Sequence, residues 1–427
     1  MLKNFKGYEL FEVETKVKEF VNKDTFTLMY LEETVFFPES AGQVEDKGVI
    51  IFEGNEYQVL GLNISDDQVV HKVELIKDIQ VGSQVKAKID RSRRDLISAN
   101  HSAAHLLFDT IRELYPTSVG KGYFNDDKGL RIDMQIDEKM DWEKIYELNR
   151  IVAEKIATPA LKKEMIVDAK TAKEVYNLSI EFNEKELEGD LRIVEFEGVS
   201  RQLCSGTHVL ALPLIQEFLI YNFETKGSNI YRFYAKTDHN LIAKEHRQAI
   251  HLEFEEMGTM HKKLLDCIDE FGFHEELAFY LKQIPSKLPK LDKNLWTNFI
   301  KVKMHITKLR EALNKYNQII DSKIKDRLFK TYSEMKPSVT GENNTFYIKE
   351  KEIDNKHCNF VADLVLKNNP NSYVEIVVED SNYFFCKSNC SISAIERMKD
   401  HPDYIIKGGG NEKTAQGNIS PRSEVKN

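Results

Sequence analysis

The chain has 427 residues, of which 41% are apolar and 30% are charged, and its formal net charge is −9 at pH 7. This length predicts two to four domains with buried cores. The acidic balance argues against bulk attraction to nucleic acid. No apolar run approaches the roughly 20 residues of a membrane helix, and the N-terminus lacks a secretion signal. Five scattered cysteines exclude a disulfide framework. We therefore expect a cytoplasmic protein with no membrane or DNA partner.

Residues 1–90 are predicted to form a small β-barrel, because short alternating runs at 58–60, 68–70 and 84–88 are separated by Gly or Asp turns. From Asp90 the apolar residues recur at helical spacing, and Asp90 or Ser92 can cap the start of this helix. Residues 91–240 then mix strands with an amphipathic helix near 140–157, which indicates an α+β domain. The expected strands in this domain are 130–134, 192–194 and 230–234.

Residues 241–336 predict a helical hairpin whose first helix stops before Pro285–Pro289. Residues 301–330 hold nine Lys or Arg and three acids, whereas residues 243–283 hold nine acids and five bases. The two arms could simply attract each other, or the basic arm could also follow phosphates. The apolar seams could pack within the hairpin or form a homodimer. Residues 337–427 predict a C-terminal α/β domain, and its polar end, 418–427, is expected to be disordered.

Two short motifs carry candidate metal ligands. His101 and His105 are four residues apart in the predicted helix, so both imidazoles lie on one helical face. Cys204 and His208 are also four apart, and Gly206 between them permits a turn. One thiolate and three imidazoles form a ligand set that favours zinc.

The sequence around these motifs resembles the editing domain of alanyl-tRNA synthetases and of their free-standing, AlaX-type relatives. The resemblance lies in residues 34–48, 93–133 and 192–209, in the same order and spacing. At the far end, residues 408–417 resemble the C-terminal tRNA-binding domain of the same synthetases. In the synthetase an aminoacylation domain precedes the editing domain. Because this sequence starts at the editing domain, we expect the long free-standing form, a deacylase acting in trans.

The resemblance implies hydrolysis of alanine tRNA mischarged with Ser or Gly at one zinc ion per chain. Zinc can polarise the ester carbonyl or lower the pKa of a bound water from 15.7 towards about 7. Four protein ligands normally close a structural site, whereas a catalytic site keeps one position open. We predict that His101, His105 and Cys204 are firm ligands and that His208 could be displaced. Alternatively, the zinc could only position substrate, or it could be purely structural. The implied ligands are His101, His105, Cys204 and His208.

Thr34, Gly42 and Gln43 belong by resemblance to the motif that lines the pocket. A hydrogen-bond partner for the Ser hydroxyl favours Ser over Ala, and Thr34 or Gln43 could supply it. Thr34 could equally be a plain strand residue and Gln43 a turn residue, while Gly42 could admit the substrate or make a turn. His71 is expected to be a strand histidine. Four residues depart from the family pattern and bear on selectivity: Ala41, Ala104, Gln202 and Ser205.

The C-terminal glycine run could cradle a phosphate through its N–H groups or form a simple loop. Two other functions stay open. Threonyl-tRNA synthetase editing domains use a similar ligand set, so the substrate could be Ser-charged threonine tRNA. Alternatively the chain could bind tRNA without hydrolysing it. The Gly-rich segments at 38–43 and 408–417 favour alanine tRNA. By resemblance the residues that contact tRNA are Gly408, Gly409, Gly410, Lys413 and Gln416.

Overall fold

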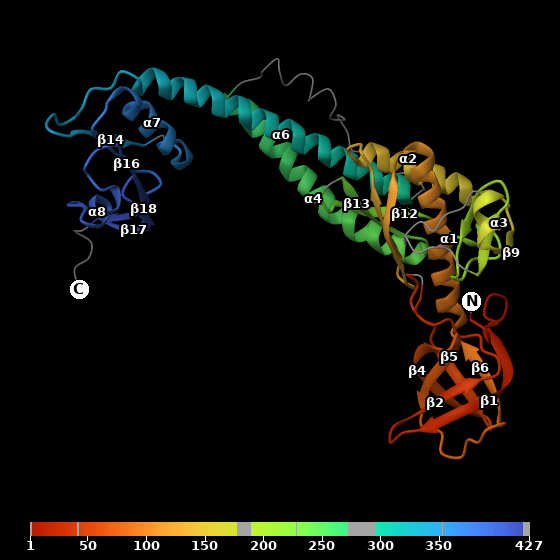
Figure 1. Cartoon of the computed structure of the whole chain (residues 1–427). Helices are drawn as coiled ribbons and strands as arrows, with labels where there is room; N and C mark the ends of the chain where they lie inside the picture. The colour runs from red at the N-terminus through yellow and green to blue at the C-terminus, as the bar shows by residue number, and fades with distance from the viewer. Residues whose placement is uncertain are drawn as a thin grey trace. The chain divides into compact units, whose positions relative to one another are not determined.

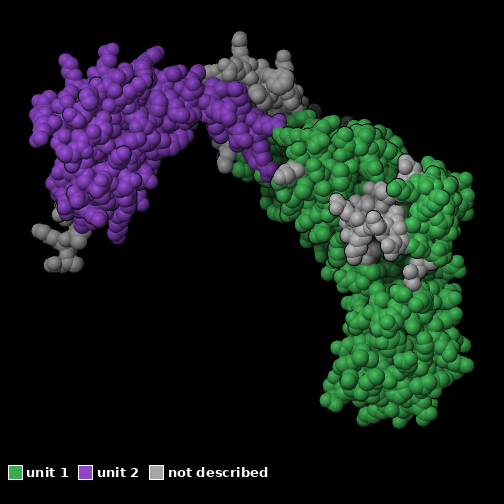
Figure 2. Space-filling view, in the orientation of Figure 1, with its two compact units in different colours: residues 1–259, 283–309 green, residues 260–282, 310–427 purple. Residues whose placement is uncertain are grey.

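The computed structural model describes residues 2–40, 42–176, 189–227, 229–271, 295–351 and 353–421. It is a mixed α+β protein that starts with a closed β-barrel and continues with further sheets and two long helices (Figure 1). The chain divides into two compact units, residues 1–259 with 283–309 and residues 260–282 with 310–427 (Figure 2). No helix in the described ranges is long and apolar enough to cross a membrane.

The N-terminal barrel confirms the fold predicted for the first 90 residues. Its strands close in the order β1-β2-β5-β4-β3-β6, and every neighbouring pair is antiparallel. Alternate residues point inward, so that Val85, Ala87 and Ile89 are buried while the residues between them are more exposed. The strands are β1 (Glu12–Asn22), β2 (Phe26–Leu31), β3 (Gly48–Phe52), β4 (Asn55–Ser65), β5 (Gln68–Glu74) and β6 (Gln84–Ile89).

Helix α1 (Arg91–Leu114) follows the barrel and forms the centre of the second domain, which is the α+β domain expected at residues 91–240. It begins at Asp90, whose side chain accepts a hydrogen bond from the backbone N–H of Arg93, as the capping pattern predicts. A four-stranded sheet of order β12-β13-β8-β7 and α2 (Trp142–Ile156) share one hydrophobic core with α1. Its strands are β7 (Val119–Asn125), β8 (Leu130–Gln135), β12 (Leu219–Thr225) and β13 (Ile230–Lys236).

A second sheet has three strands in the order β11-β10-β9. Its strand β11 contacts α1, so the segment that follows β11 begins next to α1. Backbone pairing sets its register, with Val194 opposite Gln202 on one side and opposite Glu164 on the other. The elements of this part are β9 (Lys162–Asp168), α3 (Ala169–Glu174), β10 (Asp190–Phe196), β11 (Ser200–Leu203) and the short helix η1 (Leu212–Leu214).

Two long helices follow, α4 (His239–Phe271) and α6 (Leu295–Tyr332), which are the two arms that the hairpin prediction requires. The predicted break at Pro285–Pro289 lies outside the described residues. The first turns of α6 pack on the second domain, where Trp296 and Phe299 join the core of α1 and α2. Lys308 of α6 also lies 3.4 Å from Glu143 of α2.

The C-terminal part is a five-stranded sheet of order β14-β15-β16-β18-β17. Alternate residues of β15 pack in two separate hydrophobic clusters, one with α7 and one with α8, so the two helices cover opposite faces. The prediction of a disordered end is wrong for residues 418–421, which complete β18, and residues 422–427 lie outside the described ranges. The elements are β14 (Asn344–Glu350), η2 (Asn355–His357), α7 (Cys358–Asn368), β15 (Ser372–Val378), β16 (Tyr383–Ser388), α8 (Ala394–Lys399), β17 (Tyr404–Gly410) and β18 (Thr414–Pro421).

Candidate metal centre

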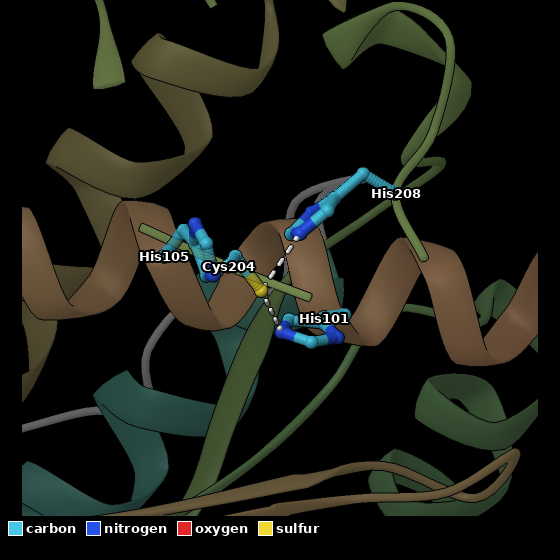
Figure 3. Close-up of side chains that lie close together, drawn as sticks. All are labelled: His101, His105, Cys204 and His208. Atoms are coloured by element: carbon cyan, nitrogen blue, oxygen red, sulfur yellow. Dashed lines mark hydrogen bonds between the residues drawn. The ribbon is translucent and has the colours of Figure 1, made fainter. Parts of the chain in front are cut away.

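The structure brings together the four residues predicted as metal ligands (Figure 3). Helix α1 supplies His101 and His105, one turn apart, and the segment after β11 supplies Cys204 and His208. The sulfur of Cys204 lies 3.2 Å from Nε2 of His101 and 3.3 Å from Nε2 of His208. One ligand atom of each residue lies within 4.8 Å of all the others. Tetrahedral zinc separates its ligand atoms by about 3.3–3.8 Å, so a small adjustment of this group would accommodate the ion.

Hydrogen bonds fix which ring nitrogen of two histidines faces the group. Nδ1 of His101 is 2.8 Å from Oε1 of Gln43, an acceptor, so Nδ1 carries the proton and Nε2 presents its lone pair towards Cys204. Nδ1 of His208 is 3.1 Å from the hydroxyl of Ser102, which likewise leaves Nε2 facing the sulfur. Partners of this kind orient metal-binding histidines and raise their basicity.

The protonation states of the group suit a divalent cation. Burial lowers the pKa of His105 to about 3, and it lowers the pKa of His101 and of His208 well below the usual value, so all three imidazoles are neutral. Burial raises the pKa of the Cys204 thiol to about 11. A metal ion would therefore bind by displacing the thiol proton. Three neutral imidazoles and one thiol, all turned inward, fit zinc.

Gly206 lies so close to α1 that no larger residue fits there. A Cβ atom at this position would overlap the ring of His101 and lie 2.9 Å from Oε1 of Gln43. The next residue, Thr207, donates its backbone N–H to Oε1 of Gln43 at 3.0 Å and accepts a hydrogen bond from the Ser98 hydroxyl at 2.9 Å. The turn that carries Cys204 and His208 is thus joined to α1 directly, through Thr207 and Ser98, and also through Gln43, which bonds to both Thr207 and His101.

Gln43 lies at this centre, where both of its polar atoms are already bonded within the chain. Oε1 accepts from His101 and from Thr207, and Nε2 donates to the Thr207 hydroxyl at 3.0 Å. Gly42 precedes it with φ of +74°, and a Cβ there would lie 2.6 Å from the ring of Tyr123. Gly42 therefore makes the tight turn that delivers Gln43 to His101. This is an orienting role that the sequence alone did not indicate.

Thr34 is placed differently from the other predicted pocket residues. It is fully buried at the barrel, where its hydroxyl lies 2.8 Å from Nε2 of His71 and accepts from the backbone N–H of Phe36 at 3.1 Å. The structure thus bonds the Thr34 hydroxyl within the barrel rather than to any of the four ligands. His71 is a buried residue of β5, as predicted, and burial lowers the pKa of His71 to about 4.

The residues that depart from the family pattern leave the four ligands intact. Ala104 is buried in the apolar core on α1. Gln202 donates to the backbone carbonyl of His105 at 3.1 Å and to the carboxylate of Asp109 at 2.6 Å, so it supports α1 at a ligand. Ser205 is exposed in the turn, and Ala41 lies outside the described residues. Sequence reasoning missed Ser102 and Thr207, although both lie inside the two ligand motifs.

The predicted tRNA-contact residues lie in the C-terminal sheet. Gly408, Gly409 and Gly410 are strand residues of β17, paired with β18 at an edge of the sheet, so the expectation of a simple loop is wrong, and the contact with phosphate stays a prediction. A Cβ at Gly408 or Gly410 would collide with the backbone of β18, which explains the glycines. Lys413 is exposed at the turn between the strands, and Gln416 accepts a hydrogen bond from the Tyr383 hydroxyl at 2.7 Å.

Two family models match parts of the chain. The model described as tRNA synthetases class II (A) matches residues 3–93, which include the barrel. The model described as the threonyl and alanyl tRNA synthetase second additional domain matches residues 191–234, which carry Cys204 and His208. These parts of the chain are thus similar to class II tRNA synthetases and to the second additional domain of threonyl and alanyl tRNA synthetases.

Similar proteins of known name indicate which of the tRNA synthetases this chain resembles. An alanine–tRNA ligase of Mesoplasma florum is 27% identical over 97% of this chain, and one of Mycoplasmopsis synoviae is 26% identical over 99%. The chain spans 46% and 47% of the length of these ligases. A crystal structure of RecJ from Thermus thermophilus with Mn2+ covers 34% of this chain and 20% of its own, with a TM-score of 0.23 and 12% identity, which is too low to carry an argument. The chain is therefore related to the alanine–tRNA ligases, which confirms the resemblance shown by its motifs.

Proposed function

We propose that this chain hydrolyses the ester of alanine tRNA mischarged with Ser or Gly, acting in trans as a zinc-dependent deacylase. One observation carries the proposal: the Cys-His₃ group takes Cys204 and His208 from the segment that matches the second additional domain of threonyl and alanyl tRNA synthetases. The similarity to alanine–tRNA ligases, which covers 97–99% of this chain and 46–47% of the ligases, supports alanine tRNA as the partner. The zinc ligands of this proposal are His101, His105, Cys204 and His208.

The residues of the chain have separable roles in this reaction. The bound zinc would supply Lewis-acid activation of the ester carbonyl or of a water molecule. Gln43 accepts the proton on Nδ1 of His101, and the Ser102 hydroxyl bonds to Nδ1 of His208, so that each Nε2 faces the cation. Gly206 leaves the space that the ring of His101 occupies.

A catalytic zinc ion keeps one coordination position open for water or substrate. The contacts favour His105 as the ligand that leaves the metal to open this position. His208 is held by both Ser102 and the sulfur of Cys204, and His101 is held by Gln43. In the part of the chain that the structure describes, no hydrogen bond fixes the ring of His105. This differs from the expectation that His208 is the loose ligand. Mutation of His105 is therefore expected to weaken zinc binding less than mutation of Cys204.

Selectivity for Ser would require an exchange of hydrogen bonds that the chain already makes. Gln43 has both polar atoms bonded within the chain, and the Thr34 hydroxyl bonds to His71. A partner for the Ser hydroxyl therefore requires one of these groups to exchange its present bond for one to the substrate. Such a site would discriminate against Ala by leaving a buried polar group unpaired.

One exposed face near the end of α6 offers a surface for the tRNA backbone. Lys323, Arg327 and Lys330 are exposed at spacings of four and three residues, which places them on one helical face. Each phosphate contact by such a side chain makes binding more sensitive to salt. Their joint replacement by Gln is expected to weaken binding of charged tRNA and to reduce the salt dependence of that binding.

The proposal is tested by adding purified alanine tRNA, charged in turn with Ser, Gly and Ala, to the full chain. Loss of Ser or Gly with Ala retained is the expected result. Threonine tRNA charged with Ser is the second substrate, because the matching domain model covers threonyl as well as alanyl tRNA synthetases. Hydrolysis of that substrate alone would replace alanine tRNA in the proposal. Binding of charged tRNA without any hydrolysis would leave a tRNA-binding protein.

A further inference from the structure

The guanidinium group of Arg192 lies directly behind the turn that carries the thiol ligand. Its Nη1 donates to the backbone carbonyl of Cys204 at 2.9 Å and to that of Gly206 at 2.8 Å. Its other edge pairs with the carboxylate of Glu164, with Nε and Nη2 at 3.0 Å and 2.8 Å from the two oxygens. The Arg192 side chain is only 3% exposed. One side chain thus joins β9, β10 and two peptides of the turn.

Tyr8 completes this contact from the N-terminal segment. Its ring lies under the Arg192 guanidinium, 3.7 Å from its carbon to the ring centroid. Its hydroxyl donates to the backbone carbonyl of Ser205 at 2.8 Å. Arg192 and Tyr8 together therefore bind the carbonyl oxygens of three consecutive residues, Cys204, Ser205 and Gly206.

The direction of these carbonyls determines the direction of the N–H groups that follow them. In a planar trans peptide the C=O of one residue and the N–H of the next point in opposite directions. Because the Ser205 carbonyl points to Tyr8, the N–H of Gly206 points inward, where it lies 3.3 Å from the sulfur of Cys204. Because the Gly206 carbonyl points to Arg192, the N–H of Thr207 reaches Oε1 of Gln43 at 3.0 Å.

We propose that Arg192 and Tyr8 are positioning residues, which hold the turn so that its peptide N–H groups support the Cys204 sulfur and Gln43. The inference rests on the proposed zinc centre but not on the identity of the substrate. An N–H directed at the sulfur stabilises the thiolate form that binds metal. Loss of the Arg192 contacts would let the peptides rotate, and the sulfur would then lose the Gly206 N–H while Gln43 would lose the Thr207 N–H.

A purely structural role makes a different prediction. If Arg192 only paired with Glu164 to stabilise the sheet, replacing another arginine that pairs with a glutamate of this sheet would lower Zn2+ affinity by a similar factor. Arg201 offers that comparison, because it pairs with Glu195 of the neighbouring strand and lies over the ring of Tyr176, 5.2 Å from its centroid. Neither of these contacts reaches the turn at Cys204. Arg201→Met therefore controls for loss of an arginine–glutamate pair in the same sheet, at a side chain that is 42% exposed.

The experiment measures Zn2+ affinity of the full chain by chelator competition, together with the absorption spectrum of its Co2+ form, for Arg192→Met, Arg192→Lys, Tyr8→Phe and Arg201→Met. Arg192→Met is expected to bind Zn2+ about 10–100-fold more weakly, as for other partners that orient metal ligands. Tyr8→Phe removes one hydrogen bond and keeps the ring, so about a 2–10-fold loss is expected. Lysine cannot reach both carbonyls and Glu164 together, so Arg192→Lys should restore affinity only in part. The cobalt–thiolate absorption should change in Arg192→Met and stay unchanged in Arg201→Met.

Wild-type affinity and an unchanged Co2+ spectrum in folded Arg192→Met would overturn the proposal, as would an equal loss in Arg201→Met. If Arg192→Met does not fold, Tyr8→Phe decides, and unchanged Zn2+ affinity in that variant overturns the proposal. These readouts do not use tRNA. A chain that hydrolyses no charged tRNA but loses Zn2+ affinity in Arg192→Met would refute the proposed function while supporting the positioning role.

Discussion

Replacing Gln43 with methionine would remove the acceptor that two buried N–H groups share, at a side chain that is fully buried. Nδ1–H of His101 and the backbone N–H of Thr207 lie 2.8 Å and 3.0 Å from the lost oxygen. Leaving each donor unpaired costs about 1–3 kcal/mol, so the free energy of unfolding is expected to fall by about 2–6 kcal/mol. The ring of His101 would also lose its fixed tautomer, which weakens metal binding by about 10–100-fold.

The assay compares Gln43→Met with Gln43→Glu, in which a carboxylate keeps the acceptor and loses only the donor to Thr207. Zn2+ affinity is measured by chelator competition and stability by urea denaturation. The glutamate variant should bind Zn2+ more tightly than the methionine variant, because its acceptor still orients His101. Equal affinity of Gln43→Met and wild type would refute the assignment of Gln43 as the partner of His101.

Three further predictions follow from the same geometry. Gly206→Ala would push a methyl group into the ring of His101, so Zn2+ content after dialysis should drop sharply while circular dichroism stays native; retained Zn2+ would contradict this. Thr34→Val leaves His71 and a backbone N–H without the hydroxyl, which should lower the free energy of unfolding by about 2–6 kcal/mol; a loss of Ser selectivity without a loss of stability would instead make Thr34 a pocket residue. Burial raises the pKa of Asp109 to about 6 from 3.8, so the folded chain binds the proton more tightly and stability falls as pH rises through this window. Asp109→Asn should therefore raise the free energy of unfolding by up to about 3 kcal/mol at pH 7.5 and change it little below pH 4. Urea denaturation at a series of pH values checks this, and the same pH dependence in wild type and Asp109→Asn would contradict it.

The barrel and the ligand motifs could be predicted because their signals are local. Alternating strands between Gly and Asp turns give the barrel, the Asp90 cap marks the start of α1, and a spacing of four places His101 and His105 on one face. The ligand types and the family resemblance predict that Cys204 lies next to this face of the helix. Spacing within each motif cannot establish it, because Cys204 lies 103 residues from His101 along the chain.

The contacts that orient the ligands could not be read from the sequence. Gln43 reaches Thr207 across 164 residues, and Arg192 and Tyr8 meet around a turn that neither adjoins in sequence. The pattern around Thr34 does not say whether its hydroxyl faces a pocket or His71. Gly408–Gly410 favours a loop by composition, but pairing with β18 overrides that local preference. Tertiary contacts decide each of these positions.

Measuring Zn2+ content and deacylation together in the wild type and in Cys204→Ala tests whether hydrolysis depends on the four-ligand centre. The substrates are alanine tRNAs charged with Ser, Gly and Ala. We expect one Zn2+ per wild-type chain and rapid loss of Ser or Gly with Ala retained, and we expect Cys204→Ala to lose both the metal and the hydrolysis. Full hydrolysis by metal-free Cys204→Ala, or no hydrolysis of any charged tRNA by zinc-loaded wild type, would contradict this expectation.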